Sequence, residues 1–365
     1  EISMKIGIIG LPNSGKTTVF NALTGGNAET ASYASGSIEP NLATVKVPDE
    51  RLHVLAGMYK PKKTTFADVQ YIDVAGLSGS AHESGGLAPA FLNYISQVDA
   101  LLHVVRAFED PNVPHPQDSV NPRRDIETVD LELTFSDLAI IERRLQRLHG
   151  EIGKTAGKEK ETRIHERDVL VRLQAGLEAD TPIRDIDLTP DEEKMLRGYQ
   201  FLSAKPMLIV LNIGEAQLGA DLLSMIEYPH AKSAVVQLAG KVEAEIAQLD
   251  PDDARAFLDD LGIEEPARER VIGASYGLLG LISFLTAGPD EVRAWPIRKG
   301  TPALEAAGTI HSDIQRGFIR AEVVAYKDLI AAGTMAEAKK HGTVRMEGKT
   351  YVVQDGDICN FLFNV

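Results

Sequence analysis

A glycine-rich turn near the start of the chain has the residue types and spacing of a phosphate-binding loop. Four residues separate Gly10 from Gly15, and Lys16 and Thr17 follow at once. The glycines permit a tight turn whose backbone N–H groups face one phosphate, and a following helix N-terminus adds partial positive charge. Lys16 would reach the β- and γ-phosphates, and the Thr17 hydroxyl would bind Mg²⁺. The stretch predicts a nucleoside triphosphate site; the alternative is a simple Gly-rich turn with a surface lysine.

The flanking residues supply the elements that this loop needs. KIGIIG before it is typical of a short buried strand, and TTVFNALTG after it is typical of a helix. A strand, a Gly-rich turn and a helix in this order are the structural context of a P-loop. The predicted phosphate-binding residues are Asn13, Ser14, Gly15, Lys16, Thr17 and Thr18.

Two later segments offer further Mg²⁺ ligands and a γ-phosphate contact. The loop GSIEPN contains Ser37, whose hydroxyl would complete the Mg²⁺ shell when the γ-phosphate is present; the alternative is a solvated serine. The apolar strand ADVQYIDVAGL ends in DVAG, where Asp73 suits Mg²⁺ through water and Gly76 can donate its N–H to the γ-phosphate. We therefore predict Thr17, Ser37 and Asp73 as metal ligands.

The residue after Gly76 affects how hydrolysis would work. Leu77 stands where many switch GTPases carry a glutamine that orients the attacking water, and leucine cannot do so. His82, in the following SGSAHESGG loop, is the nearest titratable substitute; the alternative is an exposed loop histidine. The predicted catalytic residues are His82, Lys16 and Gly76.

The segment NIGE, residues 212–215, lies where a P-loop nucleotide switch contacts the nucleotide base and distinguishes guanine from adenine. Guanine-specific P-loop switches carry Asn-Lys-x-Asp here, but this chain has Asn212, Ile213 and Glu215. The longer Glu215 carboxylate would overreach the two guanine donors, so discrimination for guanine is lost and ATP is favoured. The loop LAGKVEAEI would contact the base from its other side through the backbone of Ala239 and Gly240.

Two other regions differ from the nucleotide-binding part in the spacing of their apolar residues. Apolar residues recur at helical spacing from Leu131 through Phe135, Leu138, Ile141, Leu145 and Leu148, and a second amphipathic run follows a charged turn, which predicts an antiparallel helical hairpin. Thr189, with Pro190 and Glu192, predicts a capped helix start. After about residue 278, alternating β-rich runs separated by glycines indicate a small α+β unit.

Composition and charge limit the class of protein. The 365 residues suggest two or three domains, and 44% hydrophobic with 25% charged residues is ordinary for a globular chain. A single cysteine, Cys359, suits a reducing cytosol. No apolar run reaches membrane-spanning length, and residues 1–3 are interpreted as a cloning remnant rather than a targeting signal. We therefore expect a cytoplasmic protein with no membrane partner.

The net charge of −15 argues against non-specific wrapping of nucleic acid, so we expect no DNA partner. From residue 279 onward, however, ten Lys or Arg balance ten Asp or Glu, so all the net acidity lies elsewhere. The alternatives for this tail are an RNA or ribosomal docking face and a solvated sheet edge protected by charges. Basic residues that would form the docking face, with Trp295 and Phe318 among them, are Arg293, Arg298, Lys299, Arg316 and Arg320.

Together these segments resemble a known family. GLPNSGKTTVFNALT, SIEPN, DVAGL, HVVRAFED, NIGE and the tail GFIRAEVVAYKDL with VQDGDICNFLFNV are similar to the YchF (Obg-like ATPase) subgroup of Obg-related P-loop NTPases. The resemblance implies an α/β fold: a Ras-like P-loop domain (4–128 and 200–278), an inserted antiparallel helical coiled-coil arm (129–199) and a C-terminal β-grasp TGS domain (279–365).

The resemblance also implies chemistry and partners. It implies slow Mg²⁺-dependent hydrolysis of ATP, with GTP a weaker ligand, and association with the ribosome or ribosomal RNA in translation or stress regulation. Asn13 matches an asparagine that related NTPases link to K⁺ stimulation, so K⁺ is a second candidate cofactor. The chain departs from the family pattern at Ser37, where threonine is usual, and at Ala239, where a serine is usual. The oligomeric state is left open, with a monomer favoured.

Three other functions are alternatives to a ribosome-associated ATPase. A GTP-specific ribosome-associated GTPase requires NIGE to bind guanine. An RNA or ribosome-binding module would use its nucleotide only to regulate docking. A P-loop kinase is the least favoured, because a switch loop followed by DVAGL is a hydrolase arrangement.

Overall fold

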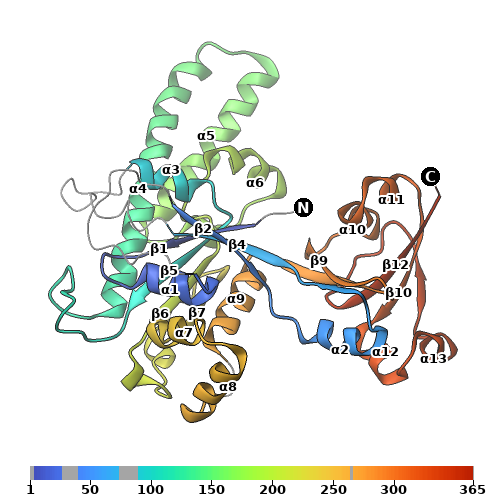
Figure 1. The fold of residues 1–365 in the computed structure, drawn as a ribbon. Coiled ribbons are helices and arrows are strands. Elements are labelled where there is room, and N and C mark those ends of the chain that lie inside the picture. The colour runs from blue at the N-terminus through green and yellow to red at the C-terminus, as the bar shows by residue number, and fades with distance from the viewer. Residues whose placement is uncertain (1–3, 27–39, 74–88, 264–265, 365) are drawn as a thin grey trace. The chain divides into compact units, whose positions relative to one another are not determined.

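The computed structural model describes residues 4–26, 40–73, 89–263 and 266–364. The chain forms two compact units (Figure 1). The larger unit comprises Lys5–Ala43 and Tyr71–Val271, and the smaller unit comprises Glu1–Met4, Thr44–Gln70 and Ile272–Val365. The P-loop motif lies in the larger unit.

A six-stranded sheet with the order β2-β4-β1-β5-β6-β7 organises the larger unit. Its parallel register pairs Ile6 with Ala100, Leu101 with Met207, and Met207 with Ser233. Parallel neighbours place their carboxyl ends at one edge and their amino ends at the other. The strands are β1 (Lys5–Ile9), β2 (Asn41–Lys46), β4 (Asp68–Asp73), β5 (Ala100–Arg106), β6 (Met207–Asn212) and β7 (Ser233–Leu238). β2 and β4 cross the boundary between the two units in sequence.

The central strands are apolar because helices cover both faces of the sheet. β5 and β6 are buried at every residue, as expected for strands inside a parallel sheet. The helices of the larger unit are α1 (Lys16–Thr24), α3 (Pro89–Ser96), α4 (Pro122–Ile152), α5 (Gly157–Glu178), α6 (Pro190–Leu196), α7 (Gly240–Ile246), α8 (Pro251–Asp260) and α9 (Ala267–Leu278), the last continuing into the smaller unit; 3-10 turns are η2 (Ile183–Asp185), η3 (Arg197–Tyr199), η4 (Glu215–Gln217) and η5 (Leu223–Met225).

Helices α4 and α5 form the predicted antiparallel arm (Figure 1). The start of its apolar stripe differs from the predicted one, because Leu131 and Phe135 are 45% and 64% exposed, whereas Ile141 and Leu148 farther along are buried as predicted. Over the first turns the buried face of α4 passes instead through Leu133 and Asp137. Two residues of helix rotate a side chain by about 200°, so the predicted stripe began on the opposite face.

The arm returns to the sheet through a capped helix, as predicted. The Thr189 hydroxyl accepts from the Glu192 N–H, the Glu192 carboxylate accepts from the Thr189 N–H, and Pro190 is the first helical residue of α6. This reciprocal capping satisfies two donors at the helix start. Asp137 of α4 then accepts from the N–H groups of Leu202 and Ser203, at 2.8 and 2.7 Å, just before β6.

The smaller unit is built on a second six-stranded sheet, with the order β11-β10-β12-β8-β9-β3. Thr44–Gln70 belongs to this unit, and β3 pairs in parallel with β9 although more than 200 residues separate them. Phe284, Phe318 and Phe361 lie in its core. Its strands are β3 (Lys63–Thr65), β8 (Leu281–Ala287), β9 (Glu291–Arg298), β10 (Phe318–Ala325), β11 (Arg345–Glu347) and β12 (Asp357–Phe363), and its helices are α2 (Glu50–Tyr59), α10 (Ala303–Ile310), α11 (Ser312–Arg316), α12 (Tyr326–Ala332) and α13 (Met335–Lys340).

The predicted α/β fold is confirmed. The boundaries of the three proposed domains remain a proposal. Across the described parts of the chain, no helix combines the length and apolar character needed to cross a bilayer.

Candidate nucleotide site

The P-loop connects the carboxyl end of β1 to the start of α1. Gly10 and Gly15 have φ angles of 146° and 91°, which L side chains rarely adopt. A Cβ on Gly10 would lie 2.4 Å from the Val104 carbonyl oxygen, and one on Gly15 would lie 2.2 Å from Asn212 Nδ2. Both glycines are therefore required by backbone conformation and by close approach.

Lys16 lies folded over this loop. Its side chain is 6% exposed, and its Nζ donates to the carbonyl oxygens of Gly10 and Leu11 at 3.0 and 2.9 Å. Burial lowers the pKa of Lys16 to about 8, although the Asp73 carboxylate acts in the opposite direction. A phosphate is a stronger acceptor for an ammonium group than a carbonyl, so Lys16 is placed to transfer its bonds to a nucleotide.

Thr17 and Asp73 lie together at the predicted metal position. Thr17 Oγ1 donates to Asp73 Oδ2 at 2.7 Å, and both residues are buried. Mg²⁺ prefers one or two protein oxygens with the remaining positions filled by phosphate and water. The described residues contain no group of three His, Cys, Asp or Glu that could hold a metal alone. The Thr17–Asp73 oxygen pair thus fits Mg²⁺ bound together with a nucleotide.

A buried histidine lies beneath the loop and was not anticipated from the sequence. His103 of β5 is buried, and neither ring nitrogen has a hydrogen-bond partner within the part of the chain that the structure describes. Burial, with a smaller contribution from the Lys16 charge, lowers the pKa of His103 to about 3. The ring is therefore neutral at physiological pH and adds no charge beside Lys16.

Asn212 connects the P-loop to Gly240, one of the predicted base contacts. Its Nδ2 donates to the Ser14 carbonyl at 2.9 Å, and its Oδ1 accepts from the Gly240 N–H at 3.0 Å. Ala239 is the N-cap residue of α7 and is buried. The structure therefore brings Ser14, Asn212, Ala239 and Gly240 together, and the Gly240 N–H is bound to Asn212.

Ile213 and Glu215 lie in different environments. The Ile213 side chain is 4% exposed and belongs to the apolar core, whereas Glu215 is exposed at the start of η4. Gln217 fixes this turn, because its Oε1 accepts from the Gly214 N–H at 2.7 Å and its Nε2 donates to the Ala107 carbonyl at 2.9 Å. We did not predict Gln217 from the sequence; its position three residues after Gly214, the capping-box spacing, was the available signal.

The remaining predicted residues fall into two groups. Asn13 is exposed with a φ of 62°, and its Nδ2 donates to the Pro114 carbonyl at 2.9 Å. Thr18 is partly buried in α1, and the Ser14 hydroxyl is buried with no hydrogen-bond partner among residues 4–26, 40–73, 89–263 and 266–364. Ser37, Gly76, Leu77 and His82 lie outside the described residues.

Comparisons with known proteins agree with this geometry. The family model MMR_HSR1, described as a 50S ribosome-binding GTPase, matches residues 5–134. The model YchF-GTPase_C, described as a protein of unknown function, matches residues 281–364. The two matches cover the P-loop region and the C-terminal sheet.

Similar proteins match along the whole length. The "Ribosome-binding ATPase YchF" of Bacillus subtilis is 43% identical over 370 residues, covering all of both chains, and that of Escherichia coli O157:H7 is 41% identical with the same coverage. A solved structure of the Schizosaccharomyces pombe YchF GTPase is 32% identical, with a TM-score of 0.85 over 99% of this chain and 98% of that one. By sequence and by fold, the chain belongs to the YchF (Obg-like ATPase) family of P-loop nucleoside triphosphatases.

Proposed function

We propose that this chain is a cytoplasmic, Mg²⁺-dependent ATPase that prefers ATP to GTP and acts as a ribosome-associated nucleotide switch. The observation that supports the hydrolase function most strongly is the Thr17–Asp73 pair, 2.7 Å apart, beside the buried Lys16. These groups supply the cation and the oxygen ligands that phosphoryl transfer requires.

In the proposed mechanism, Lys16 and the P-loop N–H groups hold the β- and γ-phosphates. Thr17, Asp73 and Ser37 would hold Mg²⁺, which would neutralise charge that develops on the phosphates. Gly76 donates its N–H to the γ-phosphate, and His82 positions the attacking water because Leu77 cannot. Positioning without a glutamine or an arginine finger supplies only part of the usual acceleration, so intrinsic turnover is slow.

The preference for ATP rests on the base-side loop. A guanine-specific site pairs a carboxylate with guanine N1 and N2, and covers the base with a lysine stem. Here Ile213 is packed in the core and Glu215 is exposed, so neither element of guanine recognition is in place. A site without paired donors and acceptors for guanine loses its discrimination for it. The alternative is a GTP-specific GTPase, which affinity measurements with ATP and GTP separate from the present proposal.

The Mg²⁺ requirement can be tested through the Thr17–Asp73 pair. We expect Asp73→Asn and Thr17→Ala each to lower ATP hydrolysis at least 100-fold and to raise the Mg²⁺ concentration needed for half-maximal rate. Thr24→Ala is the matched control, since Thr24 lies at the far end of the same helix and its described hydrogen bonds are to Phe20 and Gly26 nearby. Unchanged Mg²⁺ dependence in both site variants would contradict the proposed metal site.

K⁺ beside Asn13 is a second cofactor proposal. The Asn13 amide nitrogen is bound to Pro114, which leaves its carbonyl oxygen as the atom for a cation. We expect hydrolysis to be faster in K⁺ than in Na⁺, and Asn13→Ala to remove that difference.

Ribosome association is proposed from the names of the similar proteins and from the C-terminal sheet. Arg293 lies over the Trp295 ring at 3.9 Å, and Arg320 is exposed on β10. Arg316 is already paired with Asp313, so Arg320 is the better probe. We expect Arg320→Glu to weaken co-sedimentation with ribosomes, with Lys327→Glu as a control. Loss of co-sedimentation would support this face, and unchanged co-sedimentation would contradict it.

The alternative from another class is a ribosome-docking module whose nucleotide only regulates binding. It predicts that Lys16→Ala abolishes nucleotide binding and changes ribosome affinity, while turnover itself is dispensable. A variant that binds ATP but cannot hydrolyse it would then still cycle on and off ribosomes normally.

A further inference from the structure

A cavity of about 260 Å³ lies at the edge of the larger unit's sheet opposite the nucleotide loops. Asp99, Pro206 and Lys232, each directly before β5, β6 or β7, line it. β5 has seven residues at about 3.3 Å each, which separates the two edges by about 20 Å. The cavity is therefore distinct from the proposed ATP site.

The lining of this cavity is cationic although the chain is acidic overall. Four cationic side chains and two carboxylates, Asp99 and Glu193, line it, whereas the whole chain has a net charge of −15. The Asp99 carboxylate already accepts from the Lys5 N–H at 2.9 Å. The four cations are Arg184, Arg197, Lys205 and Lys232.

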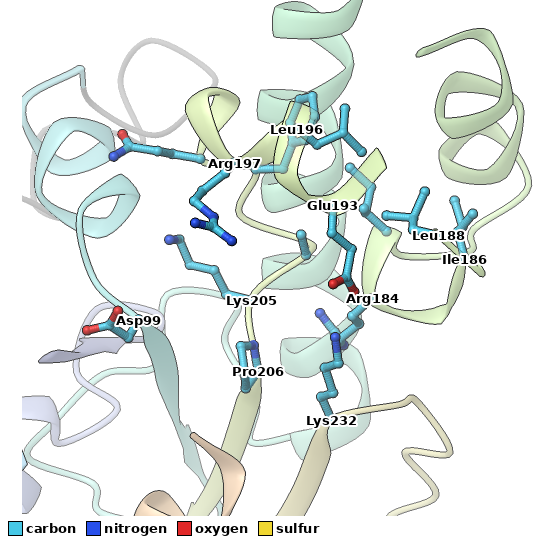
Figure 2. Close-up of a pocket in the computed structure, with 14 residues that line it drawn as sticks. Asp99, Arg184, Ile186, Leu188, Glu193, Leu196, Arg197, Lys205, Pro206 and Lys232 are labelled. Carbon is cyan, nitrogen blue, oxygen red and sulfur yellow. The ribbon is translucent and has the colours of Figure 1, made fainter. Parts of the chain in front are cut away.

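Three of these cations form no salt bridge with a carboxylate among the described residues, although the Asp99 and Asp137 carboxylates attract Lys205 at longer range. Arg197 and Lys232 are exposed and make no side-chain hydrogen bond or ion pair there. Lys205 Nζ donates only to the carbonyl oxygens of Ser96 and Val98, at 3.0 and 2.6 Å, and burial lowers its pKa. Figure 2 shows the nitrogen ends of Arg197 and Lys205 pointing toward one another. Two like charges so arranged are stabilised by an anion between them.

Arg184 adds a buried positive charge to the wall of the cavity. Its terminal nitrogens donate to the Ser203 carbonyl and the Tyr228 hydroxyl. Among the described residues its Nε has no hydrogen-bond partner, but this atom is too buried to reach a ligand in the cavity. Arg184 therefore contributes long-range attraction for an anion, and direct contacts are left to the other three cations.

The other side of the cavity is apolar. Ile186 and Leu188 lie away from the Arg197 and Lys205 end in Figure 2, and Leu196 of α6 also lines the space. The walls are thus about equally polar and apolar, with the charged groups and the apolar side chains on different sides, which suits a small molecule that has a charged head and an apolar body.

We propose that this cavity binds a small organic anion. Its carboxylate or phosphate head group contacts Arg197, Lys205 and Lys232. Its short apolar body packs against Ile186 and Leu188. Such a ligand would join the base of the helical arm to the sheet and would bind whether or not a nucleotide occupies the P-loop.

The test uses two probes, octanoate and hexyl phosphate, titrated calorimetrically into the full-length protein saturated with an ATP analogue. We expect saturable binding of one equivalent of at least one probe, and binding of neutral octanamide at least tenfold weaker. Arg197→Gln combined with Lys232→Gln should weaken the anion at least tenfold. Lys194→Gln, on α6 just before Arg197 but outside the cavity lining, is the control and should not change the affinity.

Methyl NMR of Ile186 and Leu188 locates the bound probe independently of the charge variants. Chemical-shift changes of the methyl groups of these two residues on titration with the tighter anion would support the assignment. Equal affinity for octanoate and octanamide, or equal affinity in the double variant and the parent, would overturn it. The tighter of the two anions identifies the head group.

Discussion

The two edges of the larger unit's sheet both present cationic side chains, but they differ in how those side chains are paired. At the carboxyl edge, Lys16 bonds to two carbonyls of its own loop, and Thr17 bonds to Asp73. At the amino edge, Arg197 and Lys232 have no described partner. A loop that supplies its own acceptors holds its cation in place before a ligand binds, whereas an unpaired cluster depends on an external anion.

The largest expected effect separates the two edges directly. Lys16→Ala should weaken binding of an ATP analogue at least 100-fold, about 2.7 kcal/mol, because charged contacts to two phosphates are lost. It should leave octanoate binding unchanged. Lys232→Ala should weaken octanoate binding and leave binding of the ATP analogue unchanged, which calorimetry with both ligands would measure. A loss below tenfold in Lys16→Ala would show that the carboxyl edge does not depend on this cation.

The pH dependence of ATP binding tests a consequence of burying Lys16, which the exposed Arg197 and Lys232 of the amino edge do not share. The Lys16 pKa of about 8 in the free protein lies below its ordinary value, and bound phosphates favour the charged form. Below pH 8 the ammonium is already charged, so affinity should be flat. Above pH 8 affinity should fall by up to tenfold per pH unit, with one proton taken up on binding.

Calorimetry in buffers of different ionisation enthalpy measures that proton uptake. Lys16→Arg keeps its charge and should show no slope between pH 8 and 9.5. A flat profile in the parent protein over the same range would contradict the lowered pKa.

A smaller effect is expected at the base-side turn. Gln217→Ala removes the two hydrogen bonds that hold Gly214 and Ala107, and should weaken ATP binding about fivefold, or 1 kcal/mol. Gln174→Ala, which removes a glutamine bond on the arm, is the control and should leave ATP affinity unchanged. Equal affinities in both variants and the parent would show that the turn is held by other contacts.

The smallest effect concerns the arm's connection to the amino edge. Thr189→Ala removes the N-cap of α6 and should lower the free energy of unfolding by about 1 kcal/mol in urea titrations. Thr162→Ala, in the interior of α5, should change it by less than 0.5 kcal/mol. An equal change in the two variants would mean that the cap does not contribute.

What could be predicted from the sequence was mostly local. The P-loop needs only adjacent residues, and so does the Thr189 cap; both are present in the structure. The pairing of Thr17 with Asp73 followed from the order of strands beside a P-loop. These features depend on spacing that the sequence displays directly.

The rest depends on contacts between distant residues. Periodicity alone did not show that Leu131 and Phe135 are exposed, because two stripes on one helix can both be partly apolar. The burial of Ile213 depends on the helices that cover β6. The cationic cavity combines residues from 99 to 232, and no single segment displays it.

ATP preference is the central functional claim, and affinity for the two bases tests it most directly. Nucleotide-free protein is titrated with ATP and GTP analogues in Mg²⁺, alongside Glu215→Asp and the double variant Ile213→Lys, Glu215→Asp. Because Ile213 is buried, the single variant provides a measurement if the double variant unfolds. We predict ATP binding at least tenfold tighter in the parent, about 1.4 kcal/mol, and a shift toward GTP in the variants. Tighter GTP binding in the parent would contradict this account and identify the chain as a GTPase with a degenerate base motif.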